Sequence, residues 1–386
     1  MASNNITQGL LAKGHQVKVM ALATPKHPAA KALSNPQYVD QTGFESVYQD
    51  TTVNIAGAVR HIFSSRSYNI ERFFSRRFEA ALVSTLKQSQ FDVIHFESAY
   101  TAPYRHAIRA MTNAPLVYRS HNMEYEIWQG TMALENNPLK KAYLWHLARQ
   151  LKHFERRIAN EFDGVATITK EDAATLRQIG CNVPIATIPF GLDVEDIASK
   201  QAPQEKTVFH LGSMDWIPNQ DAVRWFLKEV WPIVLEHVPE CRLLLAGRSM
   251  PDWLKSVRSQ NVVVVGEIDN AYDFMAANLV MIVPLHSGGG MRIKIVEGLA
   301  LSKPIVSTTI GAAGIDYLEG RDLYIADNSI EFAQKLIRLL ENGQLRERMA
   351  RAGRRLAEER YDNNRLIADL IEFYRNLMEA KLSLSS

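Results

Sequence analysis

The chain of 386 residues has 46% hydrophobic residues, 22% charged residues and a net charge of +2, all ordinary for a globular protein. The near-neutral charge argues against nucleic acid as a partner, and the length predicts two domains with a core each. No apolar run reaches the roughly 18 residues of a membrane-spanning helix, and the first residues do not resemble a signal peptide. Cys181 and Cys241 lie far apart with no metal-site spacing, which favours a reducing cytoplasm.

In the first half of the chain, apolar runs of strand length alternate with stretches of helical periodicity. This alternation is typical of a parallel sheet with helices on both faces, so it predicts an α/β domain. The signals are weak between 24 and 68, where one short strand is expected at 53–56. Helices are expected at 4–13, 71–88, 101–111, 139–162 and 170–179, and strands at 15–23, 91–96, 116–120, 165–168 and 185–188.

A polar stretch at 193–206 contains Pro203 and predicts an interdomain linker. After it the alternation restarts and ends in three helices. We therefore expect a first domain at 1–195, a second at 205–360 and a closing helix at 361–386. Strands of the second domain are expected at 208–211, 243–246, 262–265, 279–285, 305–307 and 323–326, and helices at 220–237, 291–301 and, last, 364–382.

Three consecutive glycines, Gly288 to Gly290, separate an expected strand from an expected helix that begins at Met291. They let the backbone turn sharply and approach a ligand without a Cβ in the way. The helix that follows presents unpaired N–H groups and a partial positive charge, which suits an anion. Arg292 and Lys294 in its first turn are unfavourable to the helix dipole by ~0.3–1 kcal/mol unless an anion binds. The pattern indicates a phosphate ligand; the alternative is an ordinary turn with solvated basic residues.

Ligands of open α/β sheets bind beyond the carboxyl ends of the strands. In the second domain these ends carry glycine, which lets a nucleotide lie against the backbone; the candidates are Gly212, Ser213, Arg248, Gly266, Glu267 and the glycine loop. A surface position is an equal alternative for Arg248. In the first domain the strand ends give Glu97-Ser98 and His121-Asn122, whereas His95 lies within a strand and is interpreted as a core residue.

The segment GGGMRIKIVEGLALSKPIVST resembles the donor-site signature of GT-B glycosyltransferases of family 4, in the form GGG-x-R-x-K-x-x-E. The resemblance covers nearly the whole chain. It implies an α/β fold of two Rossmann-like βα domains that face each other across a cleft. It also implies an acceptor-side first domain, a second domain that binds a nucleotide sugar, and a C-terminal helix that packs back on the first.

The resemblance implies roles for single residues as well. Glu297 matches the glutamate that holds the ribose of the nucleotide. The strand end at Gly266 borders the base, and the loop at Gly212 faces the phosphates. His121 resembles the histidine that lies near the transferred sugar, which outweighs the more common structural role of an isolated histidine.

The chain departs from the family signature at two places. A second glutamate of the family would fall on Gly289, so contacts with the hydroxyls of the donor sugar would pass to loop amides. The loop after Gly212 reads GSMDWIPNQD and lacks the usual Arg and Lys. Arg292 and Lys294 would then supply the charge that stabilises the leaving diphosphate.

The predicted function is a retaining transfer of a sugar from a nucleotide diphosphate sugar to a cell-envelope polysaccharide or a lipid-linked acceptor. The nucleotide sugar is a substrate, and no cofactor or metal is expected because no D-x-D motif occurs. Nicotinamide-binding, Walker and G-x-S-x-G motifs are also missing. Two alternatives remain: a GT-B sugar-nucleotide epimerase, and a scaffold that binds a nucleotide without catalysis.

Basic residues are concentrated in two stretches: 60–90 has six Lys or Arg against two Glu, and 139–157 has six against one. Aromatic residues lie among them, so both stretches suit an anionic lipid surface, at ~1 kcal/mol per basic residue. An amphipathic core helix with a solvated basic face is an equal alternative. The lipid interpretation predicts a cytoplasmic protein at the inner face of the membrane. The residues concerned are Phe63, Arg66, Arg72, Phe73, Phe74, Arg76, Arg77, Phe78, Lys140, Lys141, Tyr143, Trp145 and Arg149.

Domains of this plan begin with a strand and a glycine-bearing loop, whereas here the helix at 4–13 comes first. We therefore expect that translation starts upstream of Met1. The upstream frame should encode roughly 15–25 further residues, enough for a strand of about 5–6 residues and its loop.

Overall fold

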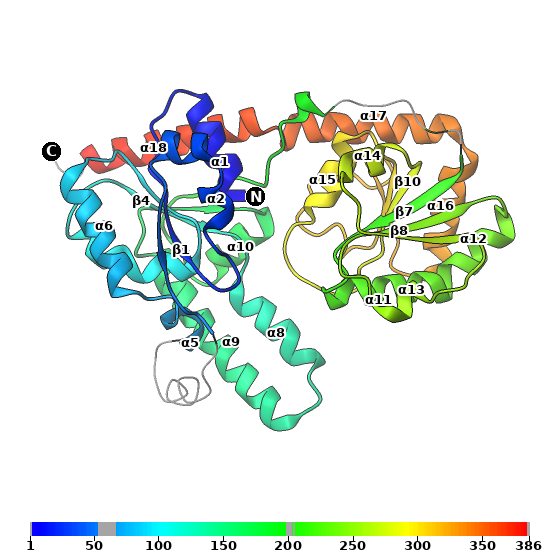
Figure 1. Cartoon of the computed structure of the whole chain (residues 1–386), viewed down its shortest axis with the longest axis horizontal. Coiled ribbons are helices and arrows are strands. Elements are labelled where there is room, and N and C mark those ends of the chain that lie inside the picture. Colours follow the sequence, from blue (N-terminus) through cyan, green and yellow to red (C-terminus); the bar gives the residue numbers. More distant parts are fainter. Residues whose placement is uncertain (1, 53–66, 198–202, 204, 384–386) are drawn as a thin grey trace. The chain divides into compact units, whose positions relative to one another are not determined.

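The computed structural model describes residues 2–52, 67–197, 203 and 205–383 and shows two compact units (Figure 1). The first unit consists of Met1–Pro189 and Leu366–Ser386, and the second is Phe190–Arg365. Leu192 and Val194 are buried, and Leu192 forms a bridge with Asp362, so the start of the predicted linker belongs to the second unit. No helix of the described ranges combines the length and apolarity that crossing a bilayer requires.

The described part of the first unit contains a parallel sheet of order β3-β4-β5-β6 and a separate parallel pair, β1-β2. The strand expected at 53–56 lies outside the described residues. The strand expected at 15–23 is shorter in the structure, where it is β1. It pairs with β2, a strand that the weak sequence pattern in this region did not predict. The strands are β1 (Met20–Ala23), β2 (Glu45–Tyr48), β3 (Ile94–Phe96), β4 (Leu116–Ser120), β5 (Gly164–Thr167) and β6 (Ile185–Thr187).

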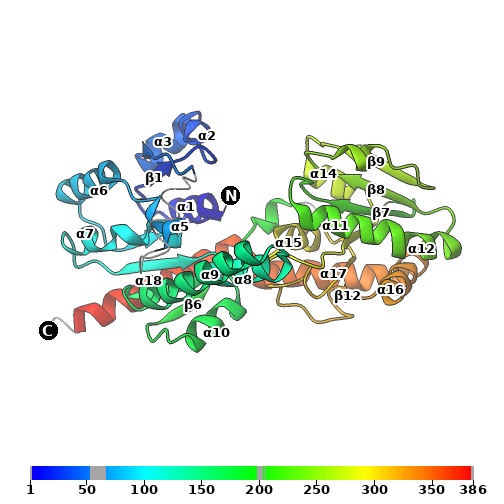
Figure 2. The same ribbon diagram turned by 90° about the horizontal axis from the view of Figure 1, so that it is seen from below.

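Helices α8 and α9 form a hairpin and lie side by side in both views (Figure 2). The Asn137 side chain caps α9 by accepting from Leu139 N and Lys140 N at 3.0 and 3.2 Å, and Pro138 fits the first turn. Helix α8 was not predicted. The helices among the described residues of this unit are α1 (Ala2–Ala12), α2 (Ala30–Leu33), α3 (Pro36–Thr42), α5 (Tyr68–Glu71), α6 (Arg76–Gln88), the 3₁₀ segment η1 (Ala99–Tyr104), α7 (Arg105–Arg109), α8 (Glu124–Leu134), α9 (Pro138–Ala159), α10 (Lys170–Gln178) and, after the second unit, α18 (Asn363–Ser383).

Helix α18 packs its apolar face on the four-stranded sheet of the first unit, as predicted. Its buried residues contact Val117 of β4 and Ala166 of β5, and each contributes about 1.5–3 kcal/mol by burial. A Cβ on Gly164 would lie 2.7 Å from the Phe373 and Leu377 side chains, so this glycine permits the close approach of the helix. The apolar residues that α18 contributes are Leu366, Ile367, Leu370, Phe373, Tyr374 and Leu377.

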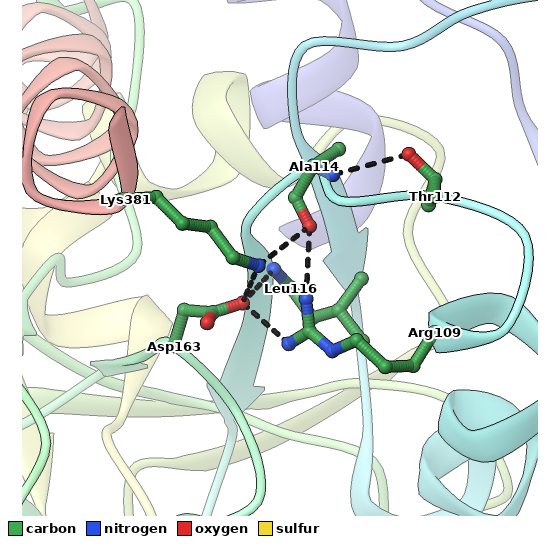
Figure 3. A network of polar contacts seen from close by, with 6 residues as sticks. All are labelled: Arg109, Thr112, Ala114, Leu116, Asp163 and Lys381. Carbon is green, nitrogen blue, oxygen red and sulfur yellow. Dashed lines mark hydrogen bonds and ion pairs between the residues drawn. The ribbon is translucent and has the colours of Figure 1, made fainter. Parts of the chain in front are cut away.

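A polar network fixes the far end of α18 (Figure 3). Asp163 Oδ2 accepts from Arg109 Nη2 at 2.5 Å, from Leu116 N at 2.7 Å and from Lys381 Nζ at 3.1 Å. Arg109 and Lys381 also donate to the Ala114 carbonyl, at 3.1 and 3.2 Å. Burial would raise the pKa of Asp163, but these donors outweigh it and hold that pKa below its usual value. The carboxylate therefore joins α18 to the start of β4.

The described part of the second unit contains a six-stranded parallel sheet of order β12-β11-β10-β7-β8-β9. Helices α14, α15 and α17 cover one face and α11, α12 and α13 cover the other (Figure 1). The strands are β7 (Thr207–Leu211), β8 (Arg242–Ala246), β9 (Val262–Gly266), β10 (Val280–Val283), β11 (Ile305–Ser307) and β12 (Tyr324–Ile325), close to the predicted ranges.

The helix predicted at 220–237 is divided into α11, a π-helical segment η3 and α12. Pro232, in the first turn of α12, lacks an N–H for an α-helical bond, which accounts for the change in hydrogen bonding before it. The part of this unit that the structure describes has these helices: the 3₁₀ segment η2 (Val194–Asp196), α11 (Ile217–Trp225), η3 (Phe226–Val230), α12 (Trp231–His237), α13 (Asp252–Lys255), α14 (Ala271–Ala276), α15 (Ile293–Ala300), α16 (Ser329–Glu341) and α17 (Gly343–Arg360).

Candidate functional site

The strand order of the second unit places a topological switch point between β7 and β10. From β7 the chain adds β8 and β9 on one side, and then adds β10, β11 and β12 on the other. In open α/β sheets the crevice outside the carboxyl ends of such strands is the usual ligand site. The loop after β7 and the glycine loop after β10 both begin there.

The glycine loop needs its glycines for two reasons. Gly288 and Gly290 have φ angles of 107° and 80°, in the region that side chains other than glycine rarely adopt. A Cβ on Gly288 would also lie 2.5 Å from the Trp216 ring. Gly289 is exposed and Met291 is half-buried, and they complete the turn into α15, whose N-cap residue is Arg292. The backbone thus reaches the N-terminus of α15 past an indole ring.

Arg292 is a buried cation without an anionic partner among the described residues. Its side chain is 8% exposed, and its guanidinium carbon lies 5.0 Å from the centroid of the Trp216 ring. Nη1 donates to the Gly289 carbonyl and, at 2.9 Å, to the Gly290 carbonyl, whereas Nε and Nη2 are buried without a partner. Burial lowers the pKa of Arg292. Two unused charged donors next to a helix N-terminus have the chemistry to hydrogen-bond an anion.

Lys294 is the second cation of this site and connects α15 to the end of β7. Its Nζ donates to the Leu211 carbonyl at 2.9 Å and to Asn219 Oδ1 at 3.3 Å. Burial, with the nearby Arg292 charge as a smaller cause, lowers the pKa of Lys294 to about 7, although Glu297 opposes the shift. A bound anion would favour the protonated amine, so Lys294 can respond to a ligand.

Glu297 lies one turn further along α15 and forms a hydrogen bond with Tyr272. Burial raises the pKa of Glu297, and the Tyr272 hydroxyl and the Lys294 charge oppose this shift. Burial and the Glu297 carboxylate together raise the pKa of Tyr272 to about 12. The neutral tyrosine therefore donates to the carboxylate.

The carboxyl ends of β7, β8 and β9 are in close backbone contact. Gly247 N donates to the Gly266 carbonyl at 2.8 Å, and a Cβ on Gly247 would lie 1.9 Å from the Gly212 carbonyl oxygen. Arg248 is exposed, and its Nε donates to Ser213 Oγ at 2.8 Å. Glu267 follows Gly266 and is exposed.

Three residues of this site were not among the predicted candidates: Trp216, Asn219 and Tyr272. Asn219 Nδ2 donates to the Ser213 carbonyl at 2.8 Å, while its Oδ1 accepts from Lys294, so it joins the β7 loop to α15. Trp216 and Asn219, the N-cap residue and a first-turn residue of α11, belong to the stretch GSMDWIPNQD in which the family's Arg and Lys were expected. That departure in the sequence was the signal that could have identified them.

In the first unit, His121 follows β4 and contacts Glu97, which follows β3. His121 Nε2 lies 3.0 Å from Glu97 Oε2, and His95 Nε2 lies 3.3 Å from Glu97 Oε1. Burial would raise the pKa of Glu97, but the contacts with both histidines and the Arg119 charge outweigh it and hold that pKa well below its usual range. His95, interpreted from the sequence as a core residue, thus belongs to the polar group around His121.

The two basic stretches differ in the structure. Near α6, Phe74 stacks on Tyr104 with ring centroids 5.4 Å apart, Phe78 is buried, and Phe73 packs on Tyr100 at 4.5 Å. These aromatic side chains therefore pack within the unit, as the core-helix alternative expected. Phe63 and Arg66 lie outside the described residues. On α9, by contrast, Trp145 is 53% exposed, and the Arg149 guanidinium lies 5.5 Å from its ring centroid.

Two family models identify the class of protein to which this fold belongs, the GT-B glycosyltransferases. A model described as "Glycosyltransferase Family 4" matches residues 4–196, and one described as "Glycosyl transferases group 1" matches residues 205–342. The chain belongs to this family of glycosyltransferases, as the resemblance in its sequence implied.

The chain is also similar to individual proteins. A phosphatidyl-myo-inositol mannosyltransferase of Mycobacterium leprae (strain TN) is 24% identical over 391 residues, which cover 96% of this chain and 91% of that protein. The capsular polysaccharide biosynthesis glycosyltransferase CapM of Staphylococcus aureus is 21% identical over 223 residues, which cover 55% and 58%. The structure of Anabaena HepE in complex with UDP matches with a TM-score of 0.65 and 16% identity, over 96% of both chains, and this likeness supports the fold.

Proposed function

We propose that this protein is a retaining glycosyltransferase that moves a sugar from a nucleotide diphosphate sugar to a cell-envelope polysaccharide or a lipid-linked acceptor. The observation that carries the proposal is the buried Arg292 guanidinium, which has two unused donors beside the glycine loop. A nucleotide diphosphate has the charge and the oxygen acceptors that such donors bind. The complex of HepE with UDP, and the names of the mannosyltransferase and of CapM, support the donor and the acceptor classes.

Arg292, Lys294 and the N-terminus of α15 stabilise the leaving diphosphate in this proposal, so no metal ion is assigned to that role. The glycine loop gives the phosphates access to backbone amides. Glu297 binds the ribose, and its bond to Tyr272 is replaced by a ribose hydroxyl. The end of β9, at Gly266 and Glu267, borders the base.

The remaining assignments concern the sugar and the loop ends. Gly212 and Ser213 face the phosphates, and Arg248 adds a solvent-exposed charge at the same edge. His121 borders the transferred sugar and is a catalytic residue of the proposal together with Arg292 and Lys294. The proposal assigns no protein nucleophile and no cofactor.

The experiment is an assay of UDP-, GDP- and ADP-sugars with and without a lipid-linked glycan acceptor, in the presence of EDTA. Transfer that depends on the acceptor supports the proposal. Conversion of the sugar nucleotide without an acceptor would instead identify an epimerase, and binding without any turnover would identify a scaffold. Arg292→Lys should lower activity, because lysine keeps the charge but loses the planar donor pair. Arg242→Ala is the matched control, since Arg242 is the first residue of β8 and the candidate site lies at the carboxyl ends of the strands.

The proposal places the protein in the cytoplasm, with α9 on the anionic inner face of the membrane. Five exposed side chains follow one another on α9 at intervals of three or four residues: Lys141, Trp145, Arg149, Lys152 and Arg156. The acidic residue of this helix, Glu155, is buried. A row of four cations around an exposed tryptophan suits anionic headgroups, at about 1 kcal/mol per basic residue.

Sedimentation with vesicles of phosphatidylglycerol and phosphatidylcholine tests this placement. We expect the double variant Lys141→Glu with Arg149→Glu to lose binding, while Arg76→Glu with Arg77→Glu on α6 keeps it. Equal loss in both variants would show a general charge effect. Equal binding to vesicles of phosphatidylcholine alone would contradict the assignment.

A further inference from the structure

A line of four polar side chains in the first unit runs from α18 to His121. The Tyr374 hydroxyl lies 2.5 Å from His95 Nδ1, and His95 Nε2 lies 3.3 Å from Glu97 Oε1. The other oxygen of this carboxylate, Oε2, lies 3.0 Å from His121 Nε2. Tyr374 and His95 are 279 positions apart in the sequence, so the docking of α18 brings the line together.

With neutral imidazole rings, the chemistry of these groups assigns a donor and an acceptor to the two hydrogen bonds, Tyr374–His95 and His121–Glu97. An ionised carboxylate only accepts, so a neutral His121 donates its Nε2–H to Glu97, whereas His95 Nε2 faces Glu97 Oε1 at an ion-pair distance of 3.3 Å without forming a hydrogen bond. The Tyr374 hydroxyl keeps its proton, so a neutral His95 accepts it on Nδ1 and carries its own proton on Nε2. By the same argument His121 carries its proton on Nε2, and its Nδ1 is the ring nitrogen that can accept.

The surroundings keep Glu97 ionised and in place. Arg119 is 1% exposed on β4, and its Nε lies 3.9 Å from Glu97 Oε2. Arg119 Nη2 donates to the carbonyl of Ile188, the residue after β6, at 3.2 Å, so this side chain extends from β4 past β5. Burial and the Glu97 charge both raise the pKa of Tyr374, so its hydroxyl remains a donor.

We infer that Tyr374, His95 and Glu97 are positioning residues that hold the imidazole of His121 in one orientation and one tautomer. The inference rests on the proposed function for the role of His121 in catalysis. The orientation itself follows from the geometry of the first unit. Helix α18 thus contributes to the acceptor-side unit a hydroxyl that acts on His121 through two other side chains.

The test compares Glu97→Gln and Tyr374→Phe with Tyr104→Phe. Tyr104 is a matched control in the same unit, because its buried hydroxyl accepts from Ser75 N at 2.7 Å and donates to the Phe73 carbonyl at 2.8 Å. Thermal unfolding measures the stability that each variant loses. The wild type should show a downfield imidazole N–H proton resonance that exchanges slowly with water, assigned to His121 by its loss in His121→Gln.

We expect this resonance to disappear in Glu97→Gln and to move upfield with faster exchange in Tyr374→Phe, but to remain in Tyr104→Phe. In the transfer assay, kcat should fall by up to about a hundredfold in the first two variants, while KM and UDP affinity change less than about twofold. The inference is overturned if Tyr374→Phe behaves as Tyr104→Phe does, or if the wild type lacks the resonance. A wild type without any turnover would refute the proposed function, and the resonance alone would then decide the positioning role.

Discussion

Replacing Arg292 by alanine should weaken binding of UDP far more than binding of uridine. The guanidinium has two buried donors, Nε and Nη2, that point to no partner among the described residues. A charge-assisted hydrogen bond contributes ~1.5–3 kcal/mol, which corresponds to about 10- to 150-fold in affinity. We count one such bond to phosphate as the expected loss in binding free energy. The alanine variant also loses the two bonds that Nη1 donates to the glycine loop.

Isothermal titration calorimetry with UDP, UMP and uridine measures this difference, with GDP or ADP and their nucleosides if the base differs. Arg242→Ala, at the amino end of β8, should leave all three affinities unchanged. The reasoning is refuted if Arg292→Ala weakens UDP and uridine by the same factor, since Arg292 would then act on the loop and not on phosphate. A melting curve separates this result from general unfolding.

Three further predictions concern other groups of the structure. Glu297→Gln should lower the affinity for UDP but not for pyrophosphate, as measured by calorimetry. If UDP affinity is unchanged and Tm falls slightly, Glu297 only stabilises the helix through its pair with Lys294, by about 0.2–0.5 kcal/mol. Because the pKa of Lys294 is lowered to about 7 and a bound anion would raise it, UDP affinity should fall as pH rises above 7, and Lys294→Arg should remove this dependence. Since the pKa of Asp163 is depressed, its contribution to stability is present above about pH 4 and lost as pH falls through the folded pKa, so urea unfolding of Asp163→Asn should approach that of the wild type only in acid.

The glycine loop and the helix behind it were predictable because their signal is local. Gly288 to Gly290 and the periodicity of α15 follow directly in the sequence, and the structure has both. The contacts of that helix were not predictable, since Lys294 donates to the Leu211 carbonyl, 83 positions earlier. No periodicity of α15 carries information about the end of β7.

Helix α8 was missed for a comparable reason. Its first amides, Glu124 N and Tyr125 N, donate to the buried Glu155 carboxylate of α9, at 2.8 and 3.1 Å. A helix that is capped from 30 residues away lacks the capping residue that marks an N-terminus in the sequence. At Pro232 the error was the opposite one, a single helix predicted where the structure has three helical segments. The apolar pattern continues across Pro232, and its missing N–H divides the helix.

The packing of α18 has a consequence for synthesis on the ribosome. The second unit is one continuous segment, Phe190–Arg365, whereas the first unit needs residues from both sides of it. During translation, Val117 and Ala166 lack their packing partners on α18, because α18 leaves the ribosome after the entire second unit. The second unit can fold as its segment emerges, but the nascent first unit keeps an apolar sheet face uncovered for the time that about 180 residues take, roughly 10–40 s at 5–20 residues per second. A chaperone that binds exposed apolar strands would therefore bind the nascent chain at the first unit.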